Sequence, residues 1–145
     1  MDTNALVKEQ LEDGEKLLRL LPQHGFDPAA ACWLLTSYDG RWRFYMVSPL
    51  VETEGINVAY LRLAEAMRPI LDELSTFDLT SVRLVGTTQP LGRDLLAALQ
   101  RVPIRRTRPF RWKGIWLGER ALDNAYFYPL PAWHLSNSNP PTVGS

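Results

Sequence analysis

Apolar residues recur every three or four positions in three stretches of the chain. This spacing predicts amphipathic helices because a helical turn takes about 3.6 residues. The stretches cover residues 4–21, residues 57–74 and the segment from Pro90 to Val102. Gly14 lies inside the apolar stripe of the first helix, which favours packing against this protein's own sheet over pairing with a second helix. Pro69 should kink or restart the second helix, since its ring removes an N–H donor.

Other segments carry apolar residues in a continuous run or at alternate positions, which predicts strands. Residues 30–38 form a nearly continuous apolar run and should lie near the centre of a sheet. Residues 42–47 alternate, and the intervening Asp39-Gly40 favours a hairpin turn because both residues tolerate positive φ. Further strands are expected at residues 79–85, 104–117 and 124–128, with the last two forming a second hairpin.

The predicted order of elements is α-β-β-α-β-α-β-β. Hairpins require antiparallel neighbours, and helical crossovers allow parallel ones, so we expect an α+β fold with a mixed five-stranded sheet and helices packed on at least one face. Residues 1–133 should form a single domain, large enough to fold without a disulfide or metal. Residues 134–145 are polar and lack periodicity, which predicts a mobile C-terminal tail.

Two segments carry a resemblance to known proteins. They are residues 42–51 (WRFYMVSPLV) and residues 123–128 (DNAYFY). Together with the order of elements over residues 1–130, they resemble a group of small bacterial proteins that have no assigned activity. The resemblance implies an α+β fold and a bacterial source, and it implies no activity, cofactor or site residue.

Composition indicates the cellular compartment of the protein. No stretch approaches the roughly 18 uninterrupted apolar residues of a membrane-spanning helix, and the first residues lack the basic-then-apolar order of a signal peptide. The single cysteine, Cys32, cannot form an intramolecular disulfide and is compatible with a reducing compartment. We therefore expect a cytoplasmic protein with no membrane contact.

Charge is divided unevenly along the chain although the net charge is zero. Residues 1–78 hold 13 acidic and 7 basic side chains, whereas residues 79–145 hold 3 acidic and 9 basic ones. A basic half raises the expectation of an anionic partner, and the two halves can also attract each other within the fold.

The basic half concentrates its charge in residues 101–113, which contain no acid and include two aromatic residues. Arginine offers fork-shaped donors to phosphate, and aromatic rings stack on unpaired bases. The predicted contact residues are therefore Arg105, Arg106, Arg108, Arg111, Trp112 and Lys113. Three interpretations stay open: an edge strand protected by charge or paired with the acidic helices, an acidic protein partner, and single-stranded nucleic acid.

A second candidate is the loop of small residues between the strand at 79–85 and the third helix. Backbone N–H groups and the helix dipole can hold an anion there, which makes Thr87, Thr88 and Arg93 the predicted anion-binding residues. The loop lacks the lysine ending of a P-loop and the three-glycine spacing of a dinucleotide site. Ordinary capping of the helix start explains the same residues.

Residues suited to catalysis are few and scattered. Glu52 and Glu54 could act as an acid and base pair, yet no nucleophile accompanies them, and carboxylates near a helix start are favoured by its dipole. Cys32 lies in an apolar strand and is expected to be an inert core thiol. His24 and His134 have no metal-ligand spacing with it. No metal, cofactor or catalytic residue is predicted.

Since the chain supplies a scaffold and a charged surface, the leading hypothesis is a non-catalytic interaction module that binds another protein. The alternative is a nucleic-acid-associated accessory protein that uses the basic and aromatic strand. A second alternative is a small enzyme whose site is assembled from carboxylates and arginine on loops.

Overall fold

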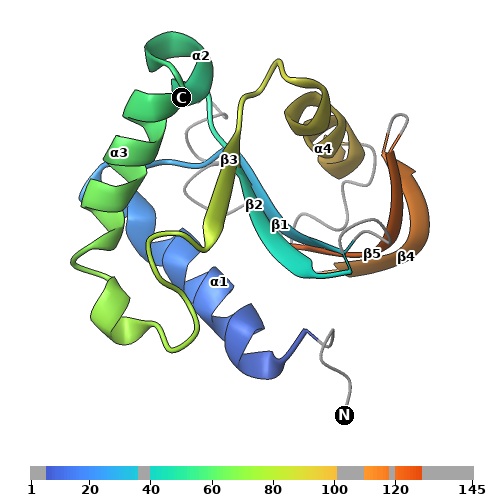
Figure 1. The fold of residues 1–145 in the computed structure, drawn as a ribbon, viewed down its shortest axis with the longest axis horizontal. Coiled ribbons are helices and arrows are strands. Elements are labelled where there is room, and N and C mark those ends of the chain that lie inside the picture. The colour runs from blue at the N-terminus through green and yellow to red at the C-terminus, as the bar shows by residue number, and fades with distance from the viewer. Residues whose placement is uncertain (1–5, 36–39, 101–109, 118–119, 129–145) are drawn as a thin grey trace, which may run out of the picture.

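The computed structural model describes residues 6–35, 40–100, 110–117 and 120–128 and has the α+β class that the sequence predicts (Figure 1). Its helices are α1 (Lys8–Leu20), α2 (Leu50–Glu54), α3 (Ile56–Met67) and α4 (Pro90–Gln100), with short 3₁₀ turns η1 (Leu21–His24) and η2 (Leu71–Glu73). Its strands are β1 (Ala30–Leu35), β2 (Trp42–Val47), β3 (Val82–Val85), β4 (Phe110–Leu117) and β5 (Arg120–Phe127). The predicted tail, residues 134–145, lies outside the described residues.

The strands form one mixed sheet in the order β3-β2-β1-β5-β4. The pairs β1–β2, β1–β5 and β4–β5 are antiparallel, whereas β2 and β3 run parallel because α2 and α3 carry the chain back before β3 begins. β1 is the middle strand, which agrees with its continuous apolar sequence, since a central strand is covered on both faces. The outer strands are β3 and β4.

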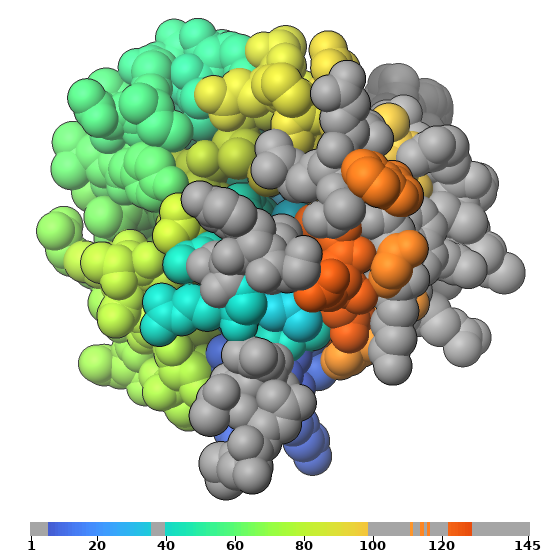
Figure 2. All heavy atoms as spheres, turned by 45° about the vertical axis from the view of Figure 1, so that its right-hand side comes forward, coloured from blue at the N-terminus to red at the C-terminus, as the bar shows by residue number. Residues whose placement is uncertain are grey.

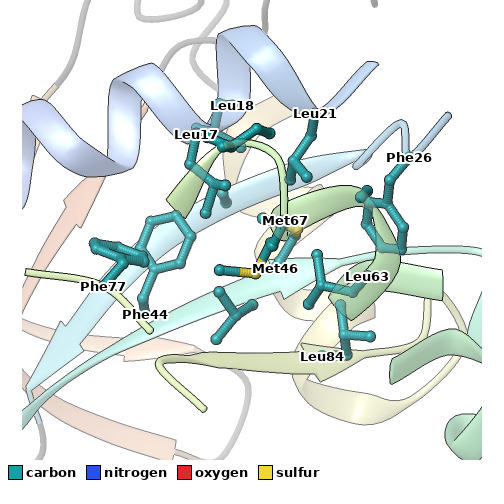
Figure 3. Packing of buried hydrophobic residues seen from close by; sticks show 14 of the residues in the cluster. Leu17, Leu18, Leu21, Phe26, Phe44, Met46, Leu63, Met67, Phe77 and Leu84 are labelled. Carbon is teal, nitrogen blue, oxygen red and sulfur yellow. The ribbon is translucent and has the colours of Figure 1, made fainter. Parts of the chain in front are cut away.

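Helices cover both faces of the sheet (Figure 1). On one face α1 and α3 pack over Phe44 and Met46 of β2 (Figure 3). On the other face Leu95 and Ala98 of α4 pack with apolar residues of β1, β2 and β5, among them Val47. Neighbouring strand residues point to opposite faces, so the alternating sequence of β2 supplies both clusters.

The helix predicted at residues 57–74 differs from the structure at both ends. α3 ends at Met67, ahead of Pro69, and only the 3₁₀ turn η2 follows. The loop expected before it contains α2, which Gly55 separates from α3 by adopting a φ of 91°. The order of elements therefore contains one helix more than expected.

Strand boundaries also shift. The strand expected at residues 104–117 is described only from Phe110 onward, and β5 begins at Arg120 where the prediction began at residue 124. β3 begins at Val82 because the carboxylate of Asp78 accepts hydrogen bonds from the N–H and hydroxyl of Thr80 and closes a turn there.

Candidate functional site

The sequence-predicted contact residues that the structure describes lie on β4. They are Arg111, Trp112 and Lys113, whereas Arg105, Arg106 and Arg108 lie outside the described residues. β4 is an outer strand that pairs with β5, and no other described strand lies beside it. The described part of the basic segment therefore forms an edge of the sheet.

Arg111 is exposed, and its guanidinium lies over two aromatic rings. It is 5.7 Å from the ring centre of Trp42 on β2 and 5.6 Å from that of Tyr126 on β5. A cation over a ring face is attracted by about 0.5–1 kcal/mol at an exposed site. Burial raises the pKa of Tyr126, and the charge of Glu15 adds to the shift while Arg111 opposes it. The sequence does not predict this contact, because only the strand order brings Trp42 near β4.

A buried tyrosine lies beside Tyr126. The hydroxyl of Tyr128 accepts a hydrogen bond from Nε1 of Trp33 at 3.0 Å and donates one to the carbonyl of Leu11 at 2.8 Å. Burial raises the pKa of this hydroxyl, so it stays protonated and keeps its donor role. Gly14 of α1 leaves room for the Tyr128 hydroxyl, since a Cβ at Gly14 would overlap it. The glycine in the apolar stripe thus lets α1 approach the sheet.

A hollow of about 200 Å³ lies where β2 and β3 begin, beside the loop of residues 76–81. Figure 2 shows this end of the sheet, with the cyan atoms of β2 between the yellow-green segment before β3 and the orange-red atoms of β4 and β5. The aromatic residues that line the hollow are Trp33, Trp42, Phe44 and Phe77, and the basic ones are Arg43 and Arg83. None of the described lining residues is acidic.

Two aspartates fix the loop that borders this hollow. Asp13 of α1 is only 5% exposed, and its Oδ2 accepts hydrogen bonds from the N–H of Ser75 at 2.8 Å and from the N–H and hydroxyl of Thr76, both at 2.6 Å. Asp78 holds the loop further along. Hydrogen bonds from the hydroxyl and N–H of Thr80 lower the pKa of Asp78, against a smaller opposing effect of burial. Hydrogen bonds thus hold the loop both to α1, through Asp13, and within itself, through Asp78.

The predicted anion site is occupied by a carboxylate of the same chain. Thr87 and Thr88 each donate their N–H and their hydroxyl to Glu52 of α2, at 2.9 to 3.1 Å. Burial by itself would raise the pKa of Glu52, but the bonds from Thr88 and Thr87 together lower it. A Cβ at Gly86 would overlap the Glu52 carboxylate, so a side chain there would displace Glu52 from the two threonines. Arg93 is exposed on α4 and no described contact joins its side chain to this group.

Two other candidates for chemistry are an ion-paired carboxylate and a buried thiol. Glu54 pairs with Arg62 at 3.2 Å, and Cys32 is buried, which raises the pKa of its thiol. His24 is exposed at the end of η1, and His134 lies outside the described residues. Within the described ranges no group of histidine, cysteine and carboxylate side chains could hold a metal ion.

Large apolar side chains are exposed at three places among the described residues. Trp116 on β4 is 68% exposed, and Val7, ahead of α1, is 44% exposed. On α3 the exposed residues are Ile56, Val58, Tyr60 and Leu61, of which Leu61 is 56% exposed. The sequence does not predict which apolar residues of α3 are exposed, because the face that α3 buries depends on where the helix meets the sheet.

No family model, curated protein or solved structure matches the chain. Among the helices that the structure describes, none is long and apolar enough to cross a membrane.

Proposed function

We propose that this protein is a non-catalytic module that binds another protein by accepting a strand along the side of β4 that does not face β5. The observation that carries the proposal is the position of β4 at the end of the sheet, where it pairs with β5 alone among the described strands. An outer strand presents unpaired N–H and C=O groups, which an incoming strand can pair. We also propose that the protein is bacterial and cytoplasmic.

The opposite edge of the sheet is less suited to this role. The backbone N–H of Leu84 on β3 donates a hydrogen bond to the hydroxyl of Tyr60 on α3, at 2.9 Å. A side chain that pairs with an outer strand blocks an incoming strand in the same way as a covering loop. β3 is also shorter than β4, with 4 residues against 8.

The side chains of β4 favour a particular kind of partner. Trp116 is 68% exposed, and tryptophan is enriched among the residues that dominate binding energy at protein interfaces. Arg111 on the same strand adds exposed positive charge, which steers association with acidic surfaces. The proposed partner is therefore a protein with an extended segment that carries acidic residues.

The test compares two charge substitutions at exposed apolar residues. Tagged wild-type protein and the variants Trp116→Glu and Leu61→Glu are used to capture partners from cells of the source organism, and bound proteins are quantified. We expect Trp116→Glu to lose the specific partner and Leu61→Glu, the matched control on α3, to keep it. Loss with Leu61→Glu alone would move the interface to α3, and a wild-type protein that captures nothing specific would overturn the proposal.

The second candidate is a single-stranded nucleic acid, which the placement of Arg111 beside Trp42 and Tyr126 favours. It ranks second because Arg111 already occupies a face of each ring, so those faces are not open to a base. Fluorescence anisotropy with single-stranded DNA and RNA tests it: binding should weaken steeply with salt and fall in Arg111→Ala. Absence of binding at low salt would remove this candidate.

A further inference from the structure

The hairpin of β4 and β5 does not alternate regularly along its whole length. On β5, Leu122, Ala125 and Phe127 are all buried in the cluster on the α4 face of the sheet. Residues 122 and 125 are an odd number of positions apart, so in a regular strand they would point to opposite faces. On β4 the irregularity lies at Gly114, which has a φ of 60° and is the residue of β4 that the register leaves without a partner on β5. The side chains of β4 therefore change face at Gly114.

This change places Arg111 and Trp116 on the same face of the sheet. Arg111 pairs with Tyr126, which packs against the cluster that α1 and α3 cover. Ile115 pairs with Leu122 of the α4 face, so the next residue, Trp116, lies on the α1 face. In a regular strand two residues that are five positions apart lie on opposite faces.

The backbone groups of Arg111 and Trp116 point away from β5. The N–H of Tyr128 donates to the carbonyl of Ala31 on β1, at 3.4 Å. Backbone bonds alternate between the two neighbours of a strand from one residue to the next, so Tyr126 also bonds β1 and does not bond Arg111, which faces it. The N–H and C=O of Arg111 are thus directed to the outer side of β4 (Figure 1). Those of Trp116 point the same way, since face and direction alternate together.

These features match β4 to a second copy of itself. When the eight residues of β4 pair antiparallel with their own copy over the full length, the first residue faces the last, and Arg111 faces Trp116 of the second copy. In a regular strand of eight residues such partners would lie on opposite faces of the joined sheet, and the pairing would fail. The change of face at Gly114 puts both residues on the α1 face, so the full length can pair.

The facing side chains are also complementary. Arg111 of each copy meets Trp116 of the other copy, so the two arginines do not face each other. The guanidinium of Arg111 lies 5.7 Å from the ring centre of Trp42 and 5.6 Å from that of Tyr126. The ring of Trp116 can cover the methylene groups of the same arginine and extend this row of rings. A two-fold axis repeats each contact.

We propose that two copies of this protein pair antiparallel along β4 and join their five-stranded sheets, with Arg111 of each copy opposite Trp116 of the other. This inference rests on the proposed function, because the second copy occupies the edge assigned there to the partner. The dimer is the resting form, which the partner strand displaces. Eight residues per copy are fewer than the roughly 20–30 a side of a stable interface, so we expect a dissociation constant on the order of 0.1 mM. At micromolar concentrations β4 is open to the partner.

Sedimentation velocity from about 10 µM to about 1 mM protein tests the dimer. The wild type should associate as its concentration rises, and Leu61→Glu, the control on α3, should associate equally. Trp116→Arg places a like charge opposite Arg111 of the second copy, whereas Trp116→Glu places an opposite charge there. Trp116→Arg should therefore dimerise at least tenfold more weakly than Trp116→Glu, since the two-fold axis repeats the contact.

A disulfide tests the register. Facing residues that exchange two backbone bonds have Cα atoms about 5.5 Å apart, which a disulfide can span. A mixture of Arg111→Cys and Trp116→Cys should therefore form a cross-linked dimer when it is oxidised. Neither variant should cross-link alone, because the two copies of one position lie about 16 Å apart. Cys32 is buried and does not compete.

Four results would overturn the inference. They are a wild type that stays monomeric at about 1 mM, equal association of Trp116→Arg and Trp116→Glu, loss of association in Leu61→Glu, and cross-linking of one variant alone as readily as the mixture. Failure of the dimer is distinguishable from failure of the proposed function. A monomeric protein that captures its partner refutes the dimer alone, whereas a cross-linked dimer of a protein that captures nothing refutes the partner alone.

Discussion

Replacing Asp13 by alanine should destabilise the protein strongly, because this buried carboxylate ties α1 to the loop before β3. Its Oδ2 accepts three hydrogen bonds, two from Thr76 and one from Ser75. A hydrogen bond to a charged group contributes about 1.5–3 kcal/mol, but bonds that share one acceptor do not add. Alanine has a higher helix propensity than aspartate, which offsets up to ~0.7 kcal/mol of this loss in the free energy of unfolding. We expect a net loss of about 3–4 kcal/mol in the free energy of unfolding.

Urea unfolding at neutral pH measures this loss, with thermal unfolding as a second probe. For a chain of 145 residues a loss of that size should lower Tm by about 10 °C. Glu12→Ala is the matched control, since Glu12 is the neighbouring acid in α1 and its ion pair within the described residues is with Lys8, at 3.8 Å with both side chains largely exposed. That pair contributes about 0.5 kcal/mol or less.

Asp13→Asn separates charge from shape in the same experiment. An asparagine keeps one carbonyl acceptor but loses the negative charge. The free energy of unfolding of Asp13→Asn should therefore fall between those of the wild type and Asp13→Ala. The reasoning would be refuted if Asp13→Ala were within about 1 kcal/mol of the Glu12→Ala control, the typical size of an ordinary single substitution.

Three further changes test other parts of the fold. Gly14→Ala should destabilise by about 1–3 kcal/mol in urea unfolding because the new Cβ would overlap Tyr128, whereas a rise in stability would show that helix propensity dominates. Glu52→Gln should lower stability more at pH 7 than at pH 3. The folded-state pKa of Glu52 is lowered, so its contribution is present above the unfolded pKa of about 4.3 and is lost as pH falls through the folded pKa; a difference that does not change with pH would contradict this. Cys32 should react with a thiol reagent only after unfolding, since burial raises its pKa, and rapid reaction of the native protein would show that the thiol is accessible.

The features that the sequence predicts well are those that depend on near neighbours. The antiparallel pairing of β1 with β2 agrees with the predicted hairpin of two apolar segments. Its register differs, because Trp42 lies opposite Leu35, whereas a two-residue turn at Asp39-Gly40 would place Phe44 there. The start of α4 at Pro90 follows from the missing N–H of proline. Pro69 is expected only to kink or restart a helix that continues to residue 74, whereas α3 ends at Met67. Each of these features joins segments that are close together in the sequence.

The features that the sequence does not predict join distant segments. Glu52 is an acid near a helix start and Thr87 is a donor near another, but only the parallel pairing of β2 with β3 brings the two together. The contact of Arg111 with Trp42 likewise depends on the strand order, and the hollow depends on the loop that Asp13 holds. Local patterns predict the elements, and the packing of those elements creates the candidate sites.

The most direct test of the proposed partner surface is hydrogen exchange of the protein alone and in complex with the partner that it captures. Backbone amides of β4 should exchange more slowly in the complex, because an added strand pairs with the groups of β4 that do not pair with β5. The amides of α3 and β3 should not change. Protection of α3 with β4 unaffected would contradict the account and would place the interface on α3, where Leu61 is exposed.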